Sequence, residues 1–337
     1  MKMIFTPVIS KLGKYDWWTG STGFYYKYGL LSAGDSTNGL VSEDTFQKPE
    51  GFILLADSGG FQTVTQRRSF VPETIAEWQD RMNSDIKFIL DYPPIERTPT
   101  GFSSTVLHGE GFRNKLALTE DASRRMVAAY TKGGDVYGVL HGNNIEELIS
   151  WRDTLMKVHD FKGWGLKVGI KGVDPLEKKI KMLAEIGVNR IHLFGVTNFM
   201  HIIMVAKYMR QYKIENCTFD STRFIATKFS NVYYPVMGNI VTWFRREEKK
   251  PDMRMACDCP VCQTLKPNSF LDANDDVTFG YISSLHNIYH FNRFAEAVVE
   301  VSKYEETLEK LRYRYSNIHG AEFIEGIATL QSFAKGD

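Results

Sequence analysis

The sequence has almost no net charge and contains no long hydrophobic run. Its 41 basic and 40 acidic residues give a formal net charge of +1, which argues against a general polyanion-binding protein, because such proteins usually have a clear basic excess. No apolar run approaches the roughly 20 residues that a membrane-spanning helix needs. Residues 3–10 are too short for a signal-peptide core and have no small-residue cleavage pattern. We therefore expect a cytoplasmic protein.

The chain does have enough apolar and aromatic residues for a large core. Hydrophobic residues make up 43% of its 337 positions and aromatic residues 13%. Such a composition buries enough surface to offset the entropy of ordering, which excludes disorder for most of the chain. The length suits one barrel of about 250 residues with an insertion, or two ordinary domains.

From residue 53 onward, short apolar runs alternate with longer segments of helical periodicity. Strands separated by helices indicate parallel β/α units, and an earlier strand near residues 3–9 brings the strand count close to eight. We predict an α/β fold, a (β/α)8 barrel. A doubly wound open sheet is the alternative, although no glycine-rich dinucleotide-binding turn follows the first strands. The predicted strands are Ile53–Asp57, Ile86–Asp91, Val136–Gly142, Gly163–Gly169, Ile191–Val196 and Cys217–Asp220, and the predicted helices are 72–82, 121–131, 145–158, 174–185 and 198–212.

The alternation stops after Asp220, where a cysteine-rich segment follows at roughly residues 245–275 and a long helix begins near Ile282. We therefore predict three parts. Residues 1–244 form the catalytic barrel core, residues 245–281 a small zinc-binding insertion, and residues 282–337 the C-terminal helices that complete the barrel.

Three of the four cysteines lie within six residues, in a C-x-C-x2-C pattern. In a cytosolic protein this spacing is poor for disulfides and suits a structural zinc site, in which a histidine is the fourth ligand. His286 and His290 lie one helical turn apart, and we favour His286 without excluding His290. The predicted ligands are Cys257, Cys259, Cys262 and His286. The remaining cysteine, Cys217, is interpreted as a small buried apolar residue.

Residues 221–268 hold eight basic and four acidic side chains together with several aromatic ones. A solvated surface of mixed charge explains this composition. A nucleic-acid contact explains it too, because cations bind phosphates while aromatic rings stack on bases. The candidate nucleic-acid-binding residues are Arg223, Lys228, Arg245 and Arg246.

Carboxylates and glycines follow the predicted strands, most clearly at Asp57, Asp91 and Asp220. In a parallel barrel the carboxyl ends of the strands form the active face. Each aspartate also has a structural interpretation, because Asp57 and Asp91 precede turn residues and Asp220 is able to cap a helix. Their joint occurrence at three strand ends favours a site.

The segment DSGGFQ at residues 57–62 resembles the signature of the queuine/7-deazaguanine tRNA-guanine transglycosylases. The resemblance extends from about residue 53 to the end of the chain, and the first fifty residues match poorly. Six further segments match in order: residues 72–94 resemble PE…SDI…FDECPP, 138–142 GIVQG, 165–169 GGLAVGE, 193–196 LMGVG and 219–223 FDC…PTR, while the cysteine cluster with 286–287 resembles the zinc site of the family.

The resemblance implies an irregular (β/α)8 TIM barrel with a zinc-bearing insertion, and an exchange of guanine for a 7-deazaguanine base. Asp220 would be the nucleophile and Asp57 the acid/base, because retention at the sugar carbon needs a carboxylate nucleophile and a second proton-transfer group. Asp91 would bind the amidine edge of the base. His141 and the backbone of Gly165, with Leu166 beside it, would contact the carbonyl edge of the base. Phe61 would stack on the base. Gly59 and Gly60 would let the chain approach closely, and Ser58 would support the site.

Several positions depart from the pattern of the family. Its usual glutamine is His141, its glutamate after the GGLAVG run is Ile170, and its PTRNARNG stretch is replaced by residues 221–227. The last change affects the segment that helps to hold an anticodon loop. The chain is therefore most similar to a divergent branch, found in bacteria and phages, that inserts bases such as preQ0 into DNA.

The resemblance implies DNA as the polymer and a 7-deazaguanine base as the second substrate, in the cytoplasm of a bacterium or of a phage host. The loss of an acceptor at Ile170 favours a nitrile-bearing base over an aminomethyl one. A tRNA substrate and a catalytically silent nucleic-acid-binding paralogue are the alternatives, although a silent paralogue is expected to lack the nucleophile. Members of the family commonly dimerise through the zinc-bearing region, so the resemblance is compatible with a homodimer, but the sequence leaves the oligomeric state open.

Overall fold

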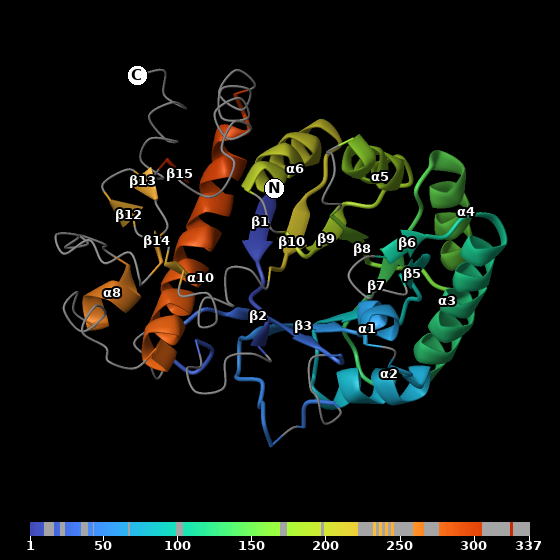
Figure 1. Cartoon of the computed structure of the whole chain (residues 1–337), viewed down its shortest axis with the longest axis horizontal. Helices are drawn as coiled ribbons and strands as arrows, with labels where there is room; N and C mark the ends of the chain where they lie inside the picture. The colour runs from blue at the N-terminus through green and yellow to red at the C-terminus, as the bar shows by residue number, and fades with distance from the viewer. Residues whose placement is uncertain are drawn as a thin grey trace. The chain divides into compact units, whose positions relative to one another are not determined.

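The computed structural model describes most of the chain (Figure 1). Among the described residues, no helix is both long and apolar enough to cross a membrane. The described residues are 1–9, 17–20, 24–34, 40–42, 44–66, 68–98, 104–168, 174–196, 199–221, 232–233, 236–237, 240–241, 244–245, 259–265, 276–304 and 324–325.

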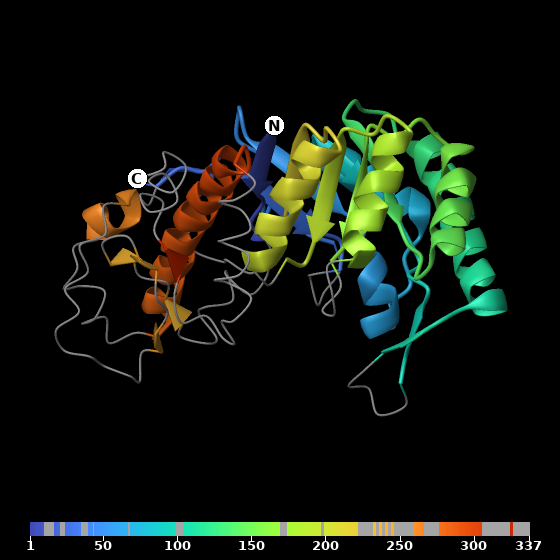
Figure 2. The ribbon, with the colours of Figure 1, turned by 90° about the horizontal axis from the view of Figure 1, so that it is seen from above.

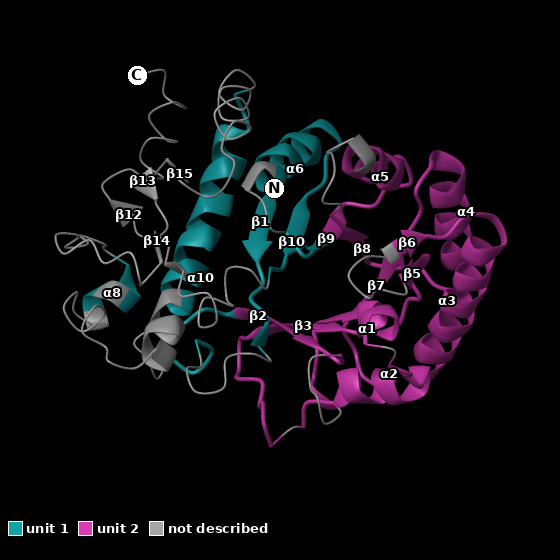
Figure 3. Ribbon diagram, in the orientation of Figure 1, with its two compact units in different colours: residues 1–27, 193–337 teal, residues 28–192 magenta. Residues whose placement is uncertain are grey.

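The chain folds as two compact units (Figure 3). One consists of residues 28–192, and the other of residues 1–27 and 193–337. Strand β9, Arg190–Phe194, contains the point where the chain passes from the first unit to the second. These units differ from the three predicted parts, and the division at residues 244 and 281 stays a prediction.

Eight strands form one sheet in the hydrogen-bonded order β1-β10-β9-β8-β7-β4-β3-β2. The pairings of β1 with β10, β2 with β3, β3 with β4, β4 with β7 and β7 with β8 are all parallel. The predicted parallel α/β architecture is therefore confirmed, while closure into a barrel and the zinc-bearing insertion stay predictions. Besides β9, the strands are β1 (Lys2–Phe5), β2 (Tyr28–Ser32), β3 (Ile53–Asp57), β4 (Ile86–Phe88), β7 (Asp135–Leu140), β8 (Gly163–Lys167) and β10 (Asn216–Phe219).

The unit of residues 28–192 connects its parallel strands through helices whose ends follow local sequence signals. Helix α2 has Pro72 in its first turn, where a missing N–H costs nothing. Helix α4 begins after Asn144, whose side chain accepts a hydrogen bond from the N–H of Glu147 at 2.8 Å. The helices are α1 (Gly60–Thr65), α2 (Pro72–Arg81), α3 (Gly109–Ala129), α4 (Ile145–Met156) and α5 (Asp174–Glu185).

Between β4 and α3 the chain forms an antiparallel hairpin, β5 (Ile95–Arg97) with β6 (Ser104–Val106). Figure 2 shows the hairpin extending away from the helices of its unit. The guanidinium of Arg97 donates to the carbonyl oxygen of Thr65 at 2.8 Å, which ties the hairpin to the end of α1.

The second unit pairs β1 with β10 and packs β1 against the long helix α10 (Asp276–Val301). The ring of Phe5 lies 5.4 Å from that of Phe219 and 5.9 Å from that of Phe291, measured between centroids, so aromatic contacts join these elements. The other elements are α6 (Phe199–Gln211), α8 (Pro260–Leu265) and the short strands β11 (Val232–Tyr233), β12 (Val236–Met237), β13 (Ile240–Val241), β14 (Phe244–Arg245) and β15 (Ile324–Glu325).

A buried ion pair stabilises the packing of α2 against β4. The Nζ atom of Lys87 lies 2.5 Å from Oδ1 of Asp80, and both side chains are almost fully buried. Burial alone would raise the pKa of Asp80, but the hydrogen bonds from Lys87 and from residues 131 and 132 outweigh it and lower the pKa. The carboxylate therefore stays ionised inside the core, with both oxygens hydrogen-bonded.

Candidate functional site

Asp57 is the last residue of β3 and is held by its neighbour on β2. The two strands pair in register, with Ser32 opposite Asp57, and the hydroxyl of Ser32 donates to Oδ2 of Asp57 at 2.6 Å. Ser32 is buried, whereas Asp57 retains partial exposure. A half-buried carboxylate with one oxygen fixed by a hydroxyl suits proton transfer to a bound molecule.

Two side chains hold the ends of β3 and β4 together. The hydroxyl of Ser58 donates to the carbonyl of Ile89 at 2.9 Å. The amide of Gln79, on α2, donates to the carbonyls of Ala56 and Phe88, each at 2.9 Å. The hydroxyl of Tyr130 in turn donates to Oε1 of Gln79 at 2.6 Å, which fixes the orientation of the amide. The backbone before Asp57 and the backbone before Asp91 therefore share one support.

The two glycines of DSGGFQ are required by close packing. Gly59 has a φ of +80°, in the left-handed region that favours glycine. At Gly60 an added Cβ would lie 2.1 Å from Oδ1 of Asp91 and 2.5 Å from its carbonyl oxygen. Only glycine therefore lets the turn after β3 approach Asp91 this closely.

Asp91 and His141, for which the resemblance implied separate contacts to a base, are in contact with each other. Nε2 of His141 lies 2.6 Å from Oδ2 of Asp91, and each side chain is 9% exposed. The histidine ring packs edge-on against Trp151, with 5.0 Å between centroids. Since a carboxylate only accepts, Nε2 carries the proton of this bond. His141 is thus in place to orient Asp91.

The remaining residues expected at the base lie on or beside β8 and α1. Gly165 and Leu166 are buried, and they pair with Val139 and Leu140 of β7. Phe61 is 45% exposed, and the Nζ atom of Lys167 lies 4.2 Å from its ring centroid. An exposed aromatic face at this end of the sheet is available for stacking.

Asp220 follows β10 in the second unit and is buried, with 8% exposure. The backbone N–H of Gly195 donates to its Oδ1 at 3.0 Å, and the N–H of Val196 donates to its carbonyl at 2.8 Å. The backbone donor fixes the position of one carboxylate oxygen, and a carboxylate is the kind of group that serves as nucleophile at a sugar carbon. The next residue, Ser221, is fully buried, and its hydroxyl has no hydrogen-bond partner among the described residues.

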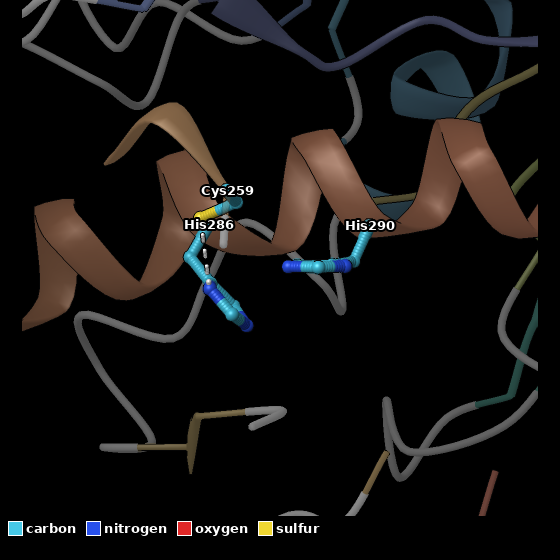
Figure 4. A group of neighbouring side chains, drawn as sticks. All are labelled: Cys259, His286 and His290. Atoms are coloured by element: carbon cyan, nitrogen blue, oxygen red, sulfur yellow. Dashed lines mark hydrogen bonds between the residues drawn. The ribbon is translucent and has the colours of Figure 1, made fainter. Parts of the chain in front are cut away.

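One cysteine and two histidines form a group that could hold a metal ion (Figure 4). The ligand atoms of Cys259, His286 and His290 all lie within 4.8 Å of one another, and Sγ of Cys259 lies 3.5 Å from Nδ1 of His286. Cys259 precedes α8, and both histidines lie on α10. Both histidines considered from the sequence therefore lie beside Cys259. Cys257 lies outside the described residues, and for Cys262 only the backbone is described.

The predicted nucleic-acid-binding residues are largely outside the described part of the chain. Arg223, Lys228 and Arg246 are not described, and Arg245 is described only as a backbone residue of β14 that pairs with Val232. Cys217 is buried, as predicted, and burial raises the pKa of its thiol.

No protein-family model matches the chain, and no curated protein matches its sequence. The transglycosylase resemblance therefore rests on the sequence motifs alone.

Sequence reasoning missed three residues that shape this site: Ser32, Gln79 and Lys167. Ser32 acts through strand register, which no local motif encodes. Gln79 is a buried polar residue of α2. A polar side chain on the helix face that packs against the sheet was the available signal of its role. Lys167 stands inside the GGLAVGE-like segment in place of a small residue, and this substitution was visible in the sequence.

Proposed function

We propose that the protein is a guanine transglycosylase that replaces guanine in DNA with a 7-deazaguanine base such as preQ0, in the cytoplasm. The observation that carries the proposal is the close fit among Asp57, Gly60 and Asp91. The turn after Asp57 contacts Asp91 at a glycine, and Ser58 and Gln79 join the two strand ends. Such a joined pair of carboxylates suits a base that is bound by one and protonated by the other.

The chemistry requires three steps. The carboxylate of Asp220 attacks the sugar C1′, the bond to guanine N9 breaks, and the departing base takes a proton from Asp57. The incoming base then gives a proton to the Asp57 carboxylate. Its nitrogen attacks C1′ and releases Asp220, so the sugar keeps its configuration and both aspartates return to their starting states.

Asp91 would bind the donor edge of the base, and His141 would hold Asp91 in that orientation. Phe61 would stack on the face of the base, and the backbone beside Gly165 and Leu166 would meet its carbonyl edge. The family usually has a glutamine at the position of His141. Within this proposal the hydrogen bond from His141 to Asp91 takes over part of the role of that glutamine.

Zinc fits the metal group. With a Zn–S bond of about 2.3 Å and a Zn–N bond of about 2.0–2.1 Å, tetrahedral geometry places sulfur and nitrogen about 3.5 Å apart. This agrees with the 3.5 Å between Cys259 Sγ and His286 Nδ1. The proposed ligands are Cys257, Cys259, Cys262 and His286, and the ion would join the segment before α8 to α10 as a structural cross-link.

Incorporation of labelled preQ0 tests the function. The purified protein is incubated with the labelled base and either DNA or tRNA, and the polymer is then counted. We expect label in DNA. Label in tRNA alone would replace the DNA proposal with the tRNA alternative, and label in neither, with polynucleotide binding retained, would favour the silent paralogue.

Covalent trapping tests the nucleophile. Asp220→Ala should abolish trapping of the polynucleotide, whereas Asp153→Asn, which changes an exposed carboxylate, should leave it unchanged. Zinc content should be the same in both variants. Trapping by Asp220→Ala at the level of the unaltered protein would remove Asp220 from the nucleophile role.

A further inference from the structure

Helix α4 has an exposed apolar stripe in addition to its buried side. Ile145 is 50% exposed, Ile149 39% and Met156 47%. Their spacings of four and seven residues place all three side chains along one side of an α-helix. Single exposed apolar residues are common, whereas a row of them marks a surface that binds another protein. The helix packs against its own unit through a different side, about 100° around its axis, formed by Leu148, Trp151 and Leu155.

Opposite charges stand at the two ends of this stripe. Glu146 is exposed in the first turn of α4, and Lys157 is exposed directly after its last residue. The two positions are eleven residues apart, which is about three helical turns, so both side chains lie along the same edge of the stripe. Asp153 is also on this edge, but it already accepts a hydrogen bond from Nε of Arg152 at 2.7 Å. The edge is therefore acidic at the start of the helix and basic at its end.

This order of charges selects a second copy of the same helix as the partner. When two identical helices pack antiparallel about a two-fold axis, the first turn of each lies against the last turn of the other. Ile145 then contacts Met156 of the second copy, and Glu146 lies beside the opposite charge of its Lys157. A parallel pair would place equal positions at the same level and would not bring these charges together. We propose that the exposed side of α4 is an interface at which two copies of this chain pack antiparallel.

The size of the surface sets the strength of the expected contact. Helix α4 has 12 residues and is about 18 Å long. One helix from each copy buries less area than the roughly 1,600 Å² of a standard interface, so the dimer should form reversibly and depend on concentration. The surface belongs to the unit of residues 28–192 and not to the cysteine-rich segment through which the resemblance would place a dimer. The proposal does not depend on the transglycosylase function.

Sedimentation velocity of the full chain over a range of concentrations tests the interface. We expect a reversible equilibrium between monomer and dimer, and Ile149→Glu should raise the dissociation constant about tenfold or more, because it places a charge in the centre of the buried stripe. Val71→Glu, at an apolar residue that is 53% exposed before α2, is the control and should leave the constant unchanged. Unfolding midpoints show whether each variant is folded. A monomer at every concentration, or a constant unchanged by Ile149→Glu, would overturn the proposal.

Reversal of charges tests the antiparallel order without altering the apolar stripe. Glu146→Lys and Lys157→Glu should each weaken the dimer about threefold or more at low salt, since each places like charges together at both ends of the interface. The variant with both changes restores opposite charges and should recover most of the affinity. Lys178→Glu, at an exposed lysine of α5, is the control. Affinity that stays low in the double variant would overturn the antiparallel pairing.

A disulfide between two different variants locates the contact directly. An equal mixture of Ile145→Cys and Met156→Cys proteins should form covalent dimers under mild oxidation, because these positions meet across the proposed interface. Either variant alone should not, since like positions are separated by about 16 Å along the helices, whereas the Cβ atoms of a disulfide lie about 4 Å apart. A dimer that forms no such link and persists in Ile149→Glu would belong to another surface, and α4 would be excluded.

Discussion

Nε2 of His141 donates a hydrogen bond of 2.6 Å to Oδ2 of Asp91, and both side chains are almost fully enclosed by protein. The other carboxylate oxygen of Asp91 faces Gly60. Asp91 is therefore held on one side by a charged-group hydrogen bond and on the other by a backbone that leaves no room for a side chain. Its orientation is fixed before any ligand arrives, which reduces the entropy cost of binding.

His141→Ala should weaken guanine binding about 10-fold to 100-fold, because a hydrogen bond to a charged group contributes about 1.5–3 kcal/mol. His141→Gln should restore part of the loss, since a glutamine amide is also a donor. Equilibrium titration with guanine measures both. His108→Gln, at an exposed histidine, is the control. Guanine affinity in His141→Ala equal to that of the unaltered protein would show that Asp91 does not need the contact.

Gly60→Ala should displace Asp91, because the new Cβ would lie 2.1 Å from Oδ1. We expect a loss of about 1–3 kcal/mol in the free energy of unfolding, as for other overpacked positions, together with loss of base exchange. Urea unfolding and the preQ0 assay measure the two effects. Gly133→Ala is the control, since an added Cβ there meets nothing within 4 Å, and its stability should change by less than about 1 kcal/mol.

Asp80→Asn should destabilise the fold by about 3–5 kcal/mol at neutral pH, because Lys87 is left buried without its carboxylate. The pKa of Asp80 is lower in the folded than in the unfolded chain, so the stabilisation is complete above about pH 4 and is lost as the pH falls through the folded pKa. Urea midpoints from pH 7 down to about pH 2 should therefore fall more in the unaltered protein than in Asp80→Asn. Asp121→Asn, at an exposed carboxylate, should follow the unaltered protein, and parallel curves for all three would refute this account.

Cys259→Ala and His286→Ala should each lose bound zinc and melt at a lower temperature, because each removes a proposed ligand of a structural ion. His290→Ala should retain zinc, since three cysteines and His286 complete four ligands. Metal analysis of the purified proteins measures this. Cys217→Ala removes a buried thiol elsewhere and should keep its metal. Zinc loss in His290→Ala, with retention in His286→Ala, would show that His290 and not His286 is the fourth ligand.

Much of the fold was predictable because its signals are local. Alternating apolar runs gave β3, β7, β8, β9 and β10, and the helix predicted at 174–185 is α5. Helix α3 begins at Gly109 rather than near residue 121, and α10 begins at Asp276 rather than near Ile282. Helix α3 begins after His108, whose side chain makes no capping hydrogen bond, so no N-cap signal marks this start. Strand β2 and the β5–β6 hairpin were also missed, since short strands become defined only through their partners.

The candidate site divides in the same way. Asp57, Asp91 and Asp220 were found from their positions after strands, and Gly59 and Gly60 from the motif. The contact between Asp91 and His141 joins residues fifty positions apart and depends on the spacing of β4 and β7, which no motif states. Ser32 and Gln79 entered through tertiary contacts alone, so their roles could not be predicted from local sequence.

The amide nitrogen of Gln79 donates hydrogen bonds to two strands, and its amide oxygen accepts one from Tyr130. The carbonyls that it binds stand immediately before Asp57 and three residues before Asp91. Because Gln79 binds both strand ends, we expect them to move together. The distance between the carboxylates of Asp57 and Asp91 should then fluctuate less than the position of either carboxylate. Under the proposed function, this one helix side chain would keep the distance between the acid and the base-binding carboxylate nearly constant from one turnover to the next.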